Sequence, residues 1–142
     1  MNADGIQAEL EALADEFALF DDWEERYRHI IDLGRALEPL SPAEHTDANK
    51  VRGCASQVWL VTEPEAGSRI HYRGDSDAHI VRGLIAILLQ LYSGRIPEDI
   101  LAFDAKAGIA HLGLTGALST QRSNGLVAMV QRIRRDAEAQ MA

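Results

Sequence analysis

The chain has 142 residues, 46% of them hydrophobic, a size that predicts one compact domain over residues 1–142 and is too short for two. Its 22 acidic and 14 basic side chains give a formal net charge of -8, which repels phosphate backbones and anionic lipid and disfavours nucleic acid and membranes as partners. The single cysteine cannot form an internal disulfide, and acidic residues interrupt the opening segment where a signal peptide needs an apolar run. We therefore expect a cytoplasmic protein.

Two helices are predicted at the start of the chain. Residues 5–20 place apolar side chains at helical intervals, which is typical of an amphipathic helix. Asp22 can cap a second helix, with Glu25 as its capping-box partner, and Pro39 stops that helix. A loop over residues 40–49, rich in small, polar and proline residues, then leads to the segment that holds the cysteine.

The next segment has the pattern of a small antiparallel sheet. Residues 56–62 are rich in β-branched and aromatic side chains, and a turn with a glycine follows over residues 64–68. Residues 69–73 alternate apolar and polar side chains, which predicts a return strand with one buried face. With a short strand over residues 49–52, we expect a sheet of about three strands.

Helices are predicted for most of the remaining chain. Residues 74–77 offer several side-chain oxygens to cap a helix that runs to about Tyr92 and that apolar residues nearly surround, so this helix is expected at the centre of the core. Pro97 begins a short helix, residues 103–118 are mixed, and Ser119 can cap the final helix. The order of elements indicates an α+β fold, a single domain in which a small antiparallel sheet packs against helices.

Cys54 is the most informative residue for function. Gly53 lets the backbone turn sharply, so the thiol is expected at a loop tip, and Lys50 and Arg52 supply positive charge that favours the thiolate. The alternative is a small buried hydrophobe, because free cysteines are among the most buried residues in proteins. Composition alone leaves these two interpretations open.

Several separated motifs occur in one order along the chain. They are Trp23-Glu24-Glu25-Arg26-Tyr27, Gly53-Cys54-x-Ser56-Gln57-Val58-Trp59, Gly74-Asp75-Ser76-Asp77-Ala78 leading into Ile80-Val81-x-Gly83-Leu84, Pro97-x-Asp99-Ile100 followed by Phe103-Asp104, and Leu118-Ser119-x-x-Arg122-x-x-Gly125-Leu126. Together these motifs resemble the SufE family of sulfur acceptors over about residues 17–135, and several motifs in register are more specific than one cysteine motif. The resemblance implies the SufE/IscU-like fold.

The resemblance also implies a function for Cys54. Members of the family bind and stimulate a pyridoxal-phosphate cysteine desulfurase, accept its persulfide sulfur on the loop cysteine, and deliver it to an iron–sulfur scaffold complex. On this interpretation the chain is a sulfur carrier and desulfurase activator, a co-substrate more than a catalyst, and it needs no cofactor of its own. Arg52, Gly53, Asp77 and Arg122 match positions near the acceptor loop or the partner face. Simpler roles stay open, with Asp77 as a helix N-terminal acid and Arg122 as a surface or capping residue.

The number of cysteines and the spacing of the histidines bear on other possible functions. A cluster scaffold of the IscU type needs several thiolates and this chain has one, and its five histidines show no metal-ligand spacing, so no metal site is expected. Two alternatives stay open: a cysteine hydrolase in which Cys54 works with a histidine base, and an interaction module that regulates a desulfurase with Cys54 incidental. A histidine within hydrogen-bond reach of Cys54 would support the first, and replacement of Cys54 by serine separates the second.

Overall fold

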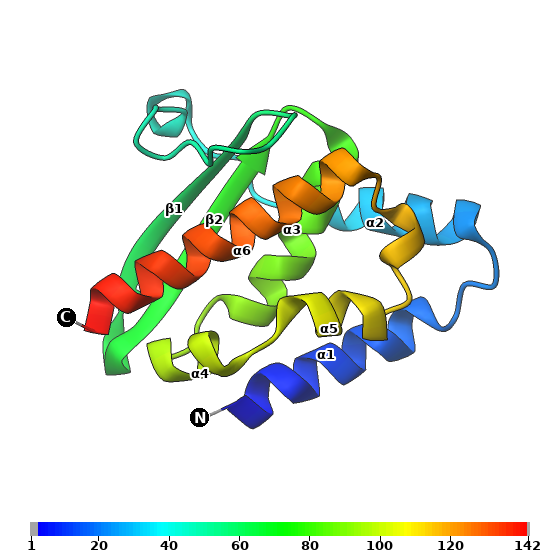
Figure 1. Cartoon of the computed structure of the whole chain (residues 1–142), viewed down its shortest axis with the longest axis horizontal. Coiled ribbons are helices and arrows are strands. Elements are labelled where there is room, and N and C mark those ends of the chain that lie inside the picture. The colour runs from blue at the N-terminus through cyan, green and yellow to red at the C-terminus, as the bar shows by residue number, and fades with distance from the viewer. Residues whose placement is uncertain (1–2, 142) are drawn as a thin grey trace.

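The computed structural model describes residues 3–141, in which two helices precede a β-hairpin and four more helices follow it (Figure 1). The elements are α1 (Ala3–Phe17), α2 (Trp23–Arg35), β1 (Val58–Glu65), β2 (Arg69–Ser76), α3 (His79–Tyr92), α4 (Pro97–Ala102), α5 (Ala105–His111) and α6 (Thr120–Met141), with short 3-10 turns at Pro42–Glu44, Ala66–Ser68 and Thr115–Ala117. This arrangement confirms the expected α+β fold. No helix in this part of the chain is both long and apolar enough to cross a membrane.

The predicted helix starts are confirmed where a side chain bonds to nearby backbone. The carboxylate of Asp22 accepts a hydrogen bond from the backbone N–H of Glu25 at 2.8 Å, and α2 begins at the next residue, Trp23. The hydroxyl of Ser119 accepts from the backbone N–H of Arg122 at 3.2 Å, at the start of α6. These bonds satisfy backbone donors that the first helical turn leaves without a partner.

The sheet has two strands, so the expectation of a third strand over residues 49–52 is wrong. β1 and β2 pair antiparallel, with Val58 opposite Ser76 at one end. Residues 49–52 contribute only an isolated bridge between Lys50 and Trp59. The pairing stops there because the chain turns at Gly53, whose φ of +93° lies in the left-handed region that favours glycine.

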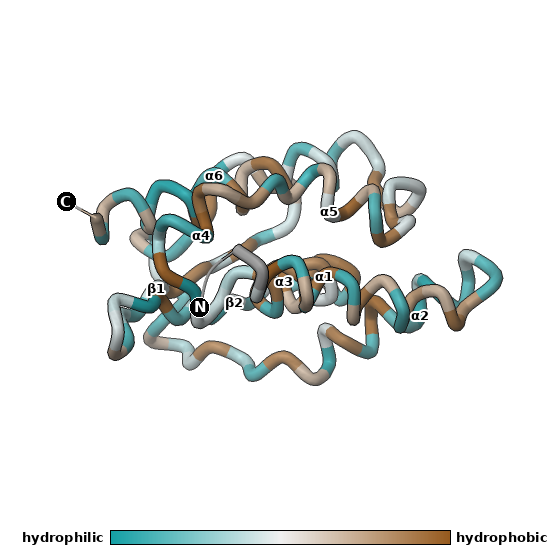
Figure 2. Tube along the Cα trace, turned by 90° about the horizontal axis from the view of Figure 1, so that it is seen from below, coloured by the Kyte–Doolittle hydropathy of each residue, from teal (hydrophilic) through white to brown (hydrophobic). Residues whose placement is uncertain are grey.

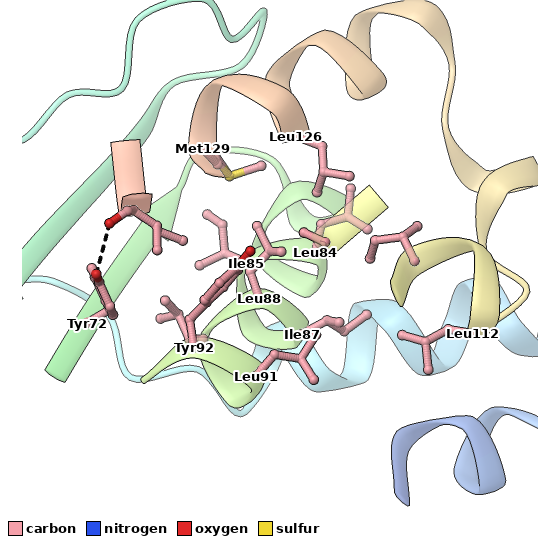
Figure 3. Close-up of a cluster of buried hydrophobic side chains, with 14 of the residues drawn as sticks. Tyr72, Leu84, Ile85, Ile87, Leu88, Leu91, Tyr92, Leu112, Leu126 and Met129 are labelled. Atoms are coloured by element: carbon pink, nitrogen blue, oxygen red, sulfur yellow. Dashed lines mark hydrogen bonds between the residues drawn. The ribbon is translucent and has the colours of Figure 1, made fainter. Parts of the chain in front are cut away.

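Helix α3 lies at the centre of the core, as its apolar sequence predicts. Ten of its 14 residues are buried. Figure 2 shows α6 lying across the layer that contains the hairpin and α3, and Figure 3 shows Leu84, Ile85 and Leu88 of α3 facing Leu126 and Met129 of α6. Removing such side chains from water is the main favourable contribution to folding. This packing positions the first turns of α3 and α6 beside each other at the end of the hairpin that carries the cysteine loop.

The start of α3 differs from the predicted cap. Its N-cap residue is Ala78, whose side chain makes no capping bond. The preceding carboxylate of Asp75 is buried instead, where it pairs with Arg82 and accepts hydrogen bonds from the backbone N–H of Leu40 at 3.2 Å and from His45 at 3.1 Å, with the proton on the histidine nitrogen. A buried carboxylate needs such partners, so Asp75 ties the end of β2 to the loop that precedes Cys54.

Candidate functional site

The loop that carries Cys54 is closed at its base by β-type hydrogen bonds. The backbone N–H of Val51 donates to the carbonyl oxygen of Val58 at 2.8 Å, and Leu60 donates to Asn49 at the same distance. Between these points the chain makes a short excursion that turns at Gly53. The prediction of a cysteine at a loop tip beside the first strand is therefore confirmed.

The thiol of Cys54 points toward helix α6 and is half-buried. It donates a hydrogen bond to the carbonyl oxygen of Gly125, with 3.6 Å between the sulfur and the oxygen. A Cβ atom built on Gly125 would lie 3.5 Å from this sulfur, and one built on Gly53 would lie 3.3 Å from the Cβ of Ala128. Small residues on α6 thus let the cysteine loop lie close against the helix.

A pocket of about 210 Å³ opens beside the Cys54 thiol. Its walls come from the cysteine loop and from the first halves of α3 and α6, and its lining residues are Cys54, Ala55, Ser56, Val58, Ala78, Ile80, Val81, Leu84, Ser119, Gln121, Arg122, Gly125 and Met129. Most of these side chains are apolar or small. Arg122 is the only charged residue among them.

The electrostatic environment of the resting thiol differs from the expectation. Burial raises the pKa of the Cys54 thiol, because the low-dielectric surroundings disfavour the thiolate. The predicted lowering by Lys50 and Arg52 is wrong, since neither residue contributes to the shift and Arg52 is exposed. The resting cysteine is therefore a protonated, poorly nucleophilic thiol at neutral pH.

The structure places Asp77 and Arg122 near the cysteine loop. Asp77 is exposed, and its carboxylate accepts from the backbone N–H of Gln57 at 3.0 Å, so it holds the loop rather than capping α3. Arg122 lines the Cys54 pocket and donates to the carbonyl oxygen of Ala117 at 3.2 Å. It is not the cap of α6, since that bond is made by Ser119.

A histidine base for Cys54 is missing from the described residues. No histidine lines the pocket, and the only hydrogen bond of the thiol in residues 3–141 is the one to Gly125. Four histidines have partners elsewhere: His29 with Glu16, His45 with Asp75, His71 with Ser93 and His111 with Glu11. The cysteine hydrolase alternative thus loses its general base. In the same part of the chain, no three metal-binding side chains gather into a site.

Two residues of the site were not predicted as contacts of the pocket. Gly125 was part of a motif, but its position against the thiol depends on the packing of a helix 71 residues further along the chain. Tyr27 was part of the second-helix motif, and its ring lies under the guanidinium of Arg122, with 5.6 Å from the guanidinium carbon to the ring centroid. Both residues belong to motifs that are visible in the sequence, whereas their contacts with Cys54 and Arg122 are visible only in the tertiary structure.

Fold and site together define a class: a small α+β protein that presents one cysteine on a loop, beside a mostly apolar pocket whose lining includes one positively charged side chain, Arg122. A family model described as the Fe-S metabolism associated domain of SufE matches residues 11–137. The chain belongs to the SufE family, which is associated with iron–sulfur metabolism.

Two relatives support this assignment, and a solved structure shares the fold. An uncharacterized SufE-like protein of Rhizobium etli is 50% identical over 140 residues, covering 96% of this chain and 95% of its own. Another from Rhizobium meliloti is 44% identical over 135 residues, covering 93% and 96%. The solution structure of a hypothetical protein from Thermus thermophilus has a TM-score of 0.75 and covers 99% of this chain and 98% of that chain at 17% identity, a similarity of fold.

Proposed function

We propose that this protein is a sulfur carrier that accepts persulfide sulfur from a cysteine desulfurase on Cys54, stimulates that enzyme, and delivers the sulfur for iron–sulfur cluster assembly. The observation that carries the proposal is the position of the chain's only cysteine in a member of the SufE family: half-buried at a loop tip, beside a mostly apolar pocket. A cytoplasmic location and a single domain are part of the same proposal, because a free thiol persists best in a reducing compartment.

The proposed transfer is a thiol exchange. The Cys54 thiolate attacks the outer sulfur of the desulfurase persulfide, a new sulfur–sulfur bond forms to Cys54, and the sulfur–sulfur bond in the enzyme breaks. The electron pair of that bond leaves on the desulfurase cysteine as a thiolate. No electrons are gained or lost overall, so the exchange requires no redox cofactor on this chain.

The raised pKa of Cys54 has a consequence for this exchange. A protonated, half-buried thiol attacks slowly, so transfer requires the loop to leave α6 and expose the sulfur. Opening breaks the hydrogen bond between Cys54 and Gly125, whereas the backbone bonds at the base of the loop can stay intact. A desulfurase that binds the open form more tightly shifts the population toward it. Return of the loop then shelters the bound persulfide in the pocket.

The partner face is proposed around the loop tip. Arg52 and Gly53 are exposed there, and Asp77 is exposed beside them. Arg122, at the edge of the Cys54 pocket, completes this face. Exposed charges influence the rate and specificity of association, so charge reversal at Asp77 should alter desulfurase stimulation. Its effect on unfolding should be limited to the loss of the single hydrogen bond from Gln57.

Incubation with a pyridoxal-phosphate cysteine desulfurase and cysteine tests the proposal. Mass spectrometry of the digested protein is expected to find one added sulfur atom on the Cys54 peptide. A Cys54→Ser variant, which preserves size and fold, serves as the control and is expected to lose both the modification and the stimulation. If that variant still stimulates the desulfurase fully, the protein is a regulator with an incidental cysteine.

A further inference from the structure

The guanidinium of Arg122 is held in place by two contacts outside the cysteine loop. It donates to the carbonyl oxygen of Ala117 at 3.2 Å, and it lies over the ring of Tyr27 on α2, 5.6 Å from the ring centroid. The face of an aromatic ring attracts a cation, so Tyr27 favours this position of the arginine. No carboxylate pairs with Arg122 in the described part of the chain, and its charge remains available to the pocket that it lines.

A sulfur atom added to Cys54 has room in this pocket. The new sulfur–sulfur bond is about 2.05 Å long, and a volume of about 30 Å³ is enough for a water molecule. The pocket of about 210 Å³ is several times larger. A persulfide also ionises more readily than the parent thiol, so the group to be accommodated is an anion at neutral pH.

Other polar or charged side chains near the pocket do not match this anion. The carboxylate of Asp77 is engaged with the backbone of Gln57, while Arg52 and His79 are exposed and line no part of the pocket. The other lining residues are uncharged. A single cation against apolar walls interacts strongly with an anion, because the local dielectric is low.

We propose that Arg122 is the counter-ion of the Cys54 persulfide in the closed loop, and that Tyr27 is the positioning residue that holds its guanidinium at the pocket. This inference rests on the proposed function, because it takes the persulfide as the ligand of the site. It assigns a role to Tyr27, one of the two aromatic residues of the second-helix motif.

The test loads sulfur without a desulfurase. Sodium tetrasulfide donates one sulfur atom to the Cys54 thiolate and leaves as trisulfide, and the rate at which iodoacetamide alkylates the persulfide is then measured against pH by mass spectrometry. For Arg122→Gln we expect the midpoint of this profile to rise by about one pH unit, the lower end of what an adjacent opposite charge produces. Tyr27→Leu should shift it in the same direction by a smaller amount, and Tyr27→Phe, which keeps the ring, should match the unmodified sequence.

Two controls separate this role from a structural one. Arg28→Gln removes an exposed positive charge from α2 that lines no part of the Cys54 pocket, and it should leave the profile unchanged. The unloaded Cys54 thiol should alkylate with the same pH profile in all these variants, because burial alone raises its pKa. Thermal unfolding identifies any variant that fails to fold. If Tyr27→Leu fails, Arg122→Gln alone tests the counter-ion, because Tyr27→Phe is expected to match the unmodified protein.

Three results would overturn the inference. One is a persulfide profile that is the same with and without Arg122. Another is an equal shift of the thiol and persulfide profiles, which would indicate a general change in the loop. The third is loading of the urea-unfolded chain by tetrasulfide without any loading of the folded protein even after prolonged incubation, when slow opening of the loop no longer limits the reaction, which would mean that the pocket does not accept the sulfur. None of these results depends on a desulfurase, so failure of the proposed transfer is distinguished from failure of the counter-ion.

Discussion

Gly125→Ala is expected to shelter the Cys54 thiol more strongly. The added methyl group would lie 3.5 Å from the sulfur and 3.8 Å from the Cα and Cβ of Cys54, which are ordinary contact distances that require no rearrangement. The contact exists only while the loop lies against α6. One buried methyl group contributes about 0.8 kcal/mol, so the open population should fall about fourfold.

Alkylation of Cys54 by iodoacetamide, followed by mass spectrometry at one fixed pH, measures this opening. The rate should fall about fourfold in Gly125→Ala, because the reagent reacts with the open loop and the open population sets the rate. The substitution also raises the stability of the helix by about 1 kcal/mol, since alanine has the higher helix propensity. A general gain in stability therefore has to be separated from the local contact.

Asn124→Ala is the matched control. Asn124 is the neighbouring exposed residue of α6 and does not line the Cys54 pocket, so its replacement raises helix propensity by about 0.5 kcal/mol without touching the thiol. We expect it to stabilise the protein and to leave the alkylation rate unchanged. If Gly125→Ala alkylates as fast as the unmodified protein, or if both variants slow equally, the loop is not held by its contact with Gly125.

Three further predictions concern stability and pH. Tyr72→Phe should lower the free energy of unfolding in urea by about 1 kcal/mol, because the Tyr72 hydroxyl donates a hydrogen bond to a backbone carbonyl of α6 at 2.9 Å. Tyr92→Phe should leave this free energy unchanged, because the Tyr92 hydroxyl has no partner within residues 3–141. Equal losses of stability in the two variants would contradict this prediction. Gly53→Ala should destabilise the protein by about 1 kcal/mol because of its positive φ, and an unchanged urea midpoint would refute that strain. Alkylation of Cys54 should titrate at higher pH in the folded protein than in the urea-unfolded chain, because burial raises the thiol pKa. The contribution of this pKa difference to the free energy of unfolding is fully present below the unfolded-state pKa, about 8.5, and is lost as pH rises through the folded-state pKa. Titration curves that superimpose in the two states would count against the prediction.

Features with local causes were predicted from the sequence. The caps of α2 and α6 were predicted because Asp22 and Ser119 each bond to a backbone group three residues away. The central position of α3 followed from its continuous apolar sequence. The loop position of Cys54 followed from the glycine before it and the strand pattern after it.

Features with distant causes were not predicted. The prediction of a third strand was wrong because the segment around Lys50 pairs with β1 at only one bridge before the chain turns away. Residues 74–77 were expected to cap α3, but Asp75 is buried, where it pairs with Arg82 and accepts a hydrogen bond from the backbone of Leu40. The pKa of Cys54 was expected to be lowered by basic residues that are near in sequence, but it is raised. The cause is burial of the thiol against α6, which the local sequence does not reveal.

A single-turnover transfer tests the carrier role most directly. A cysteine desulfurase is loaded with its persulfide, freed of cysteine, and mixed with an equal amount of this protein, and the intact masses of both proteins are followed in time. If Cys54 carries the sulfur, the desulfurase loses one sulfur atom as this protein gains one, and the Cys54→Ser variant gains none. If the desulfurase keeps its sulfur, or if the sulfur appears as free sulfide while Cys54 stays unmodified, the protein is not a sulfur carrier.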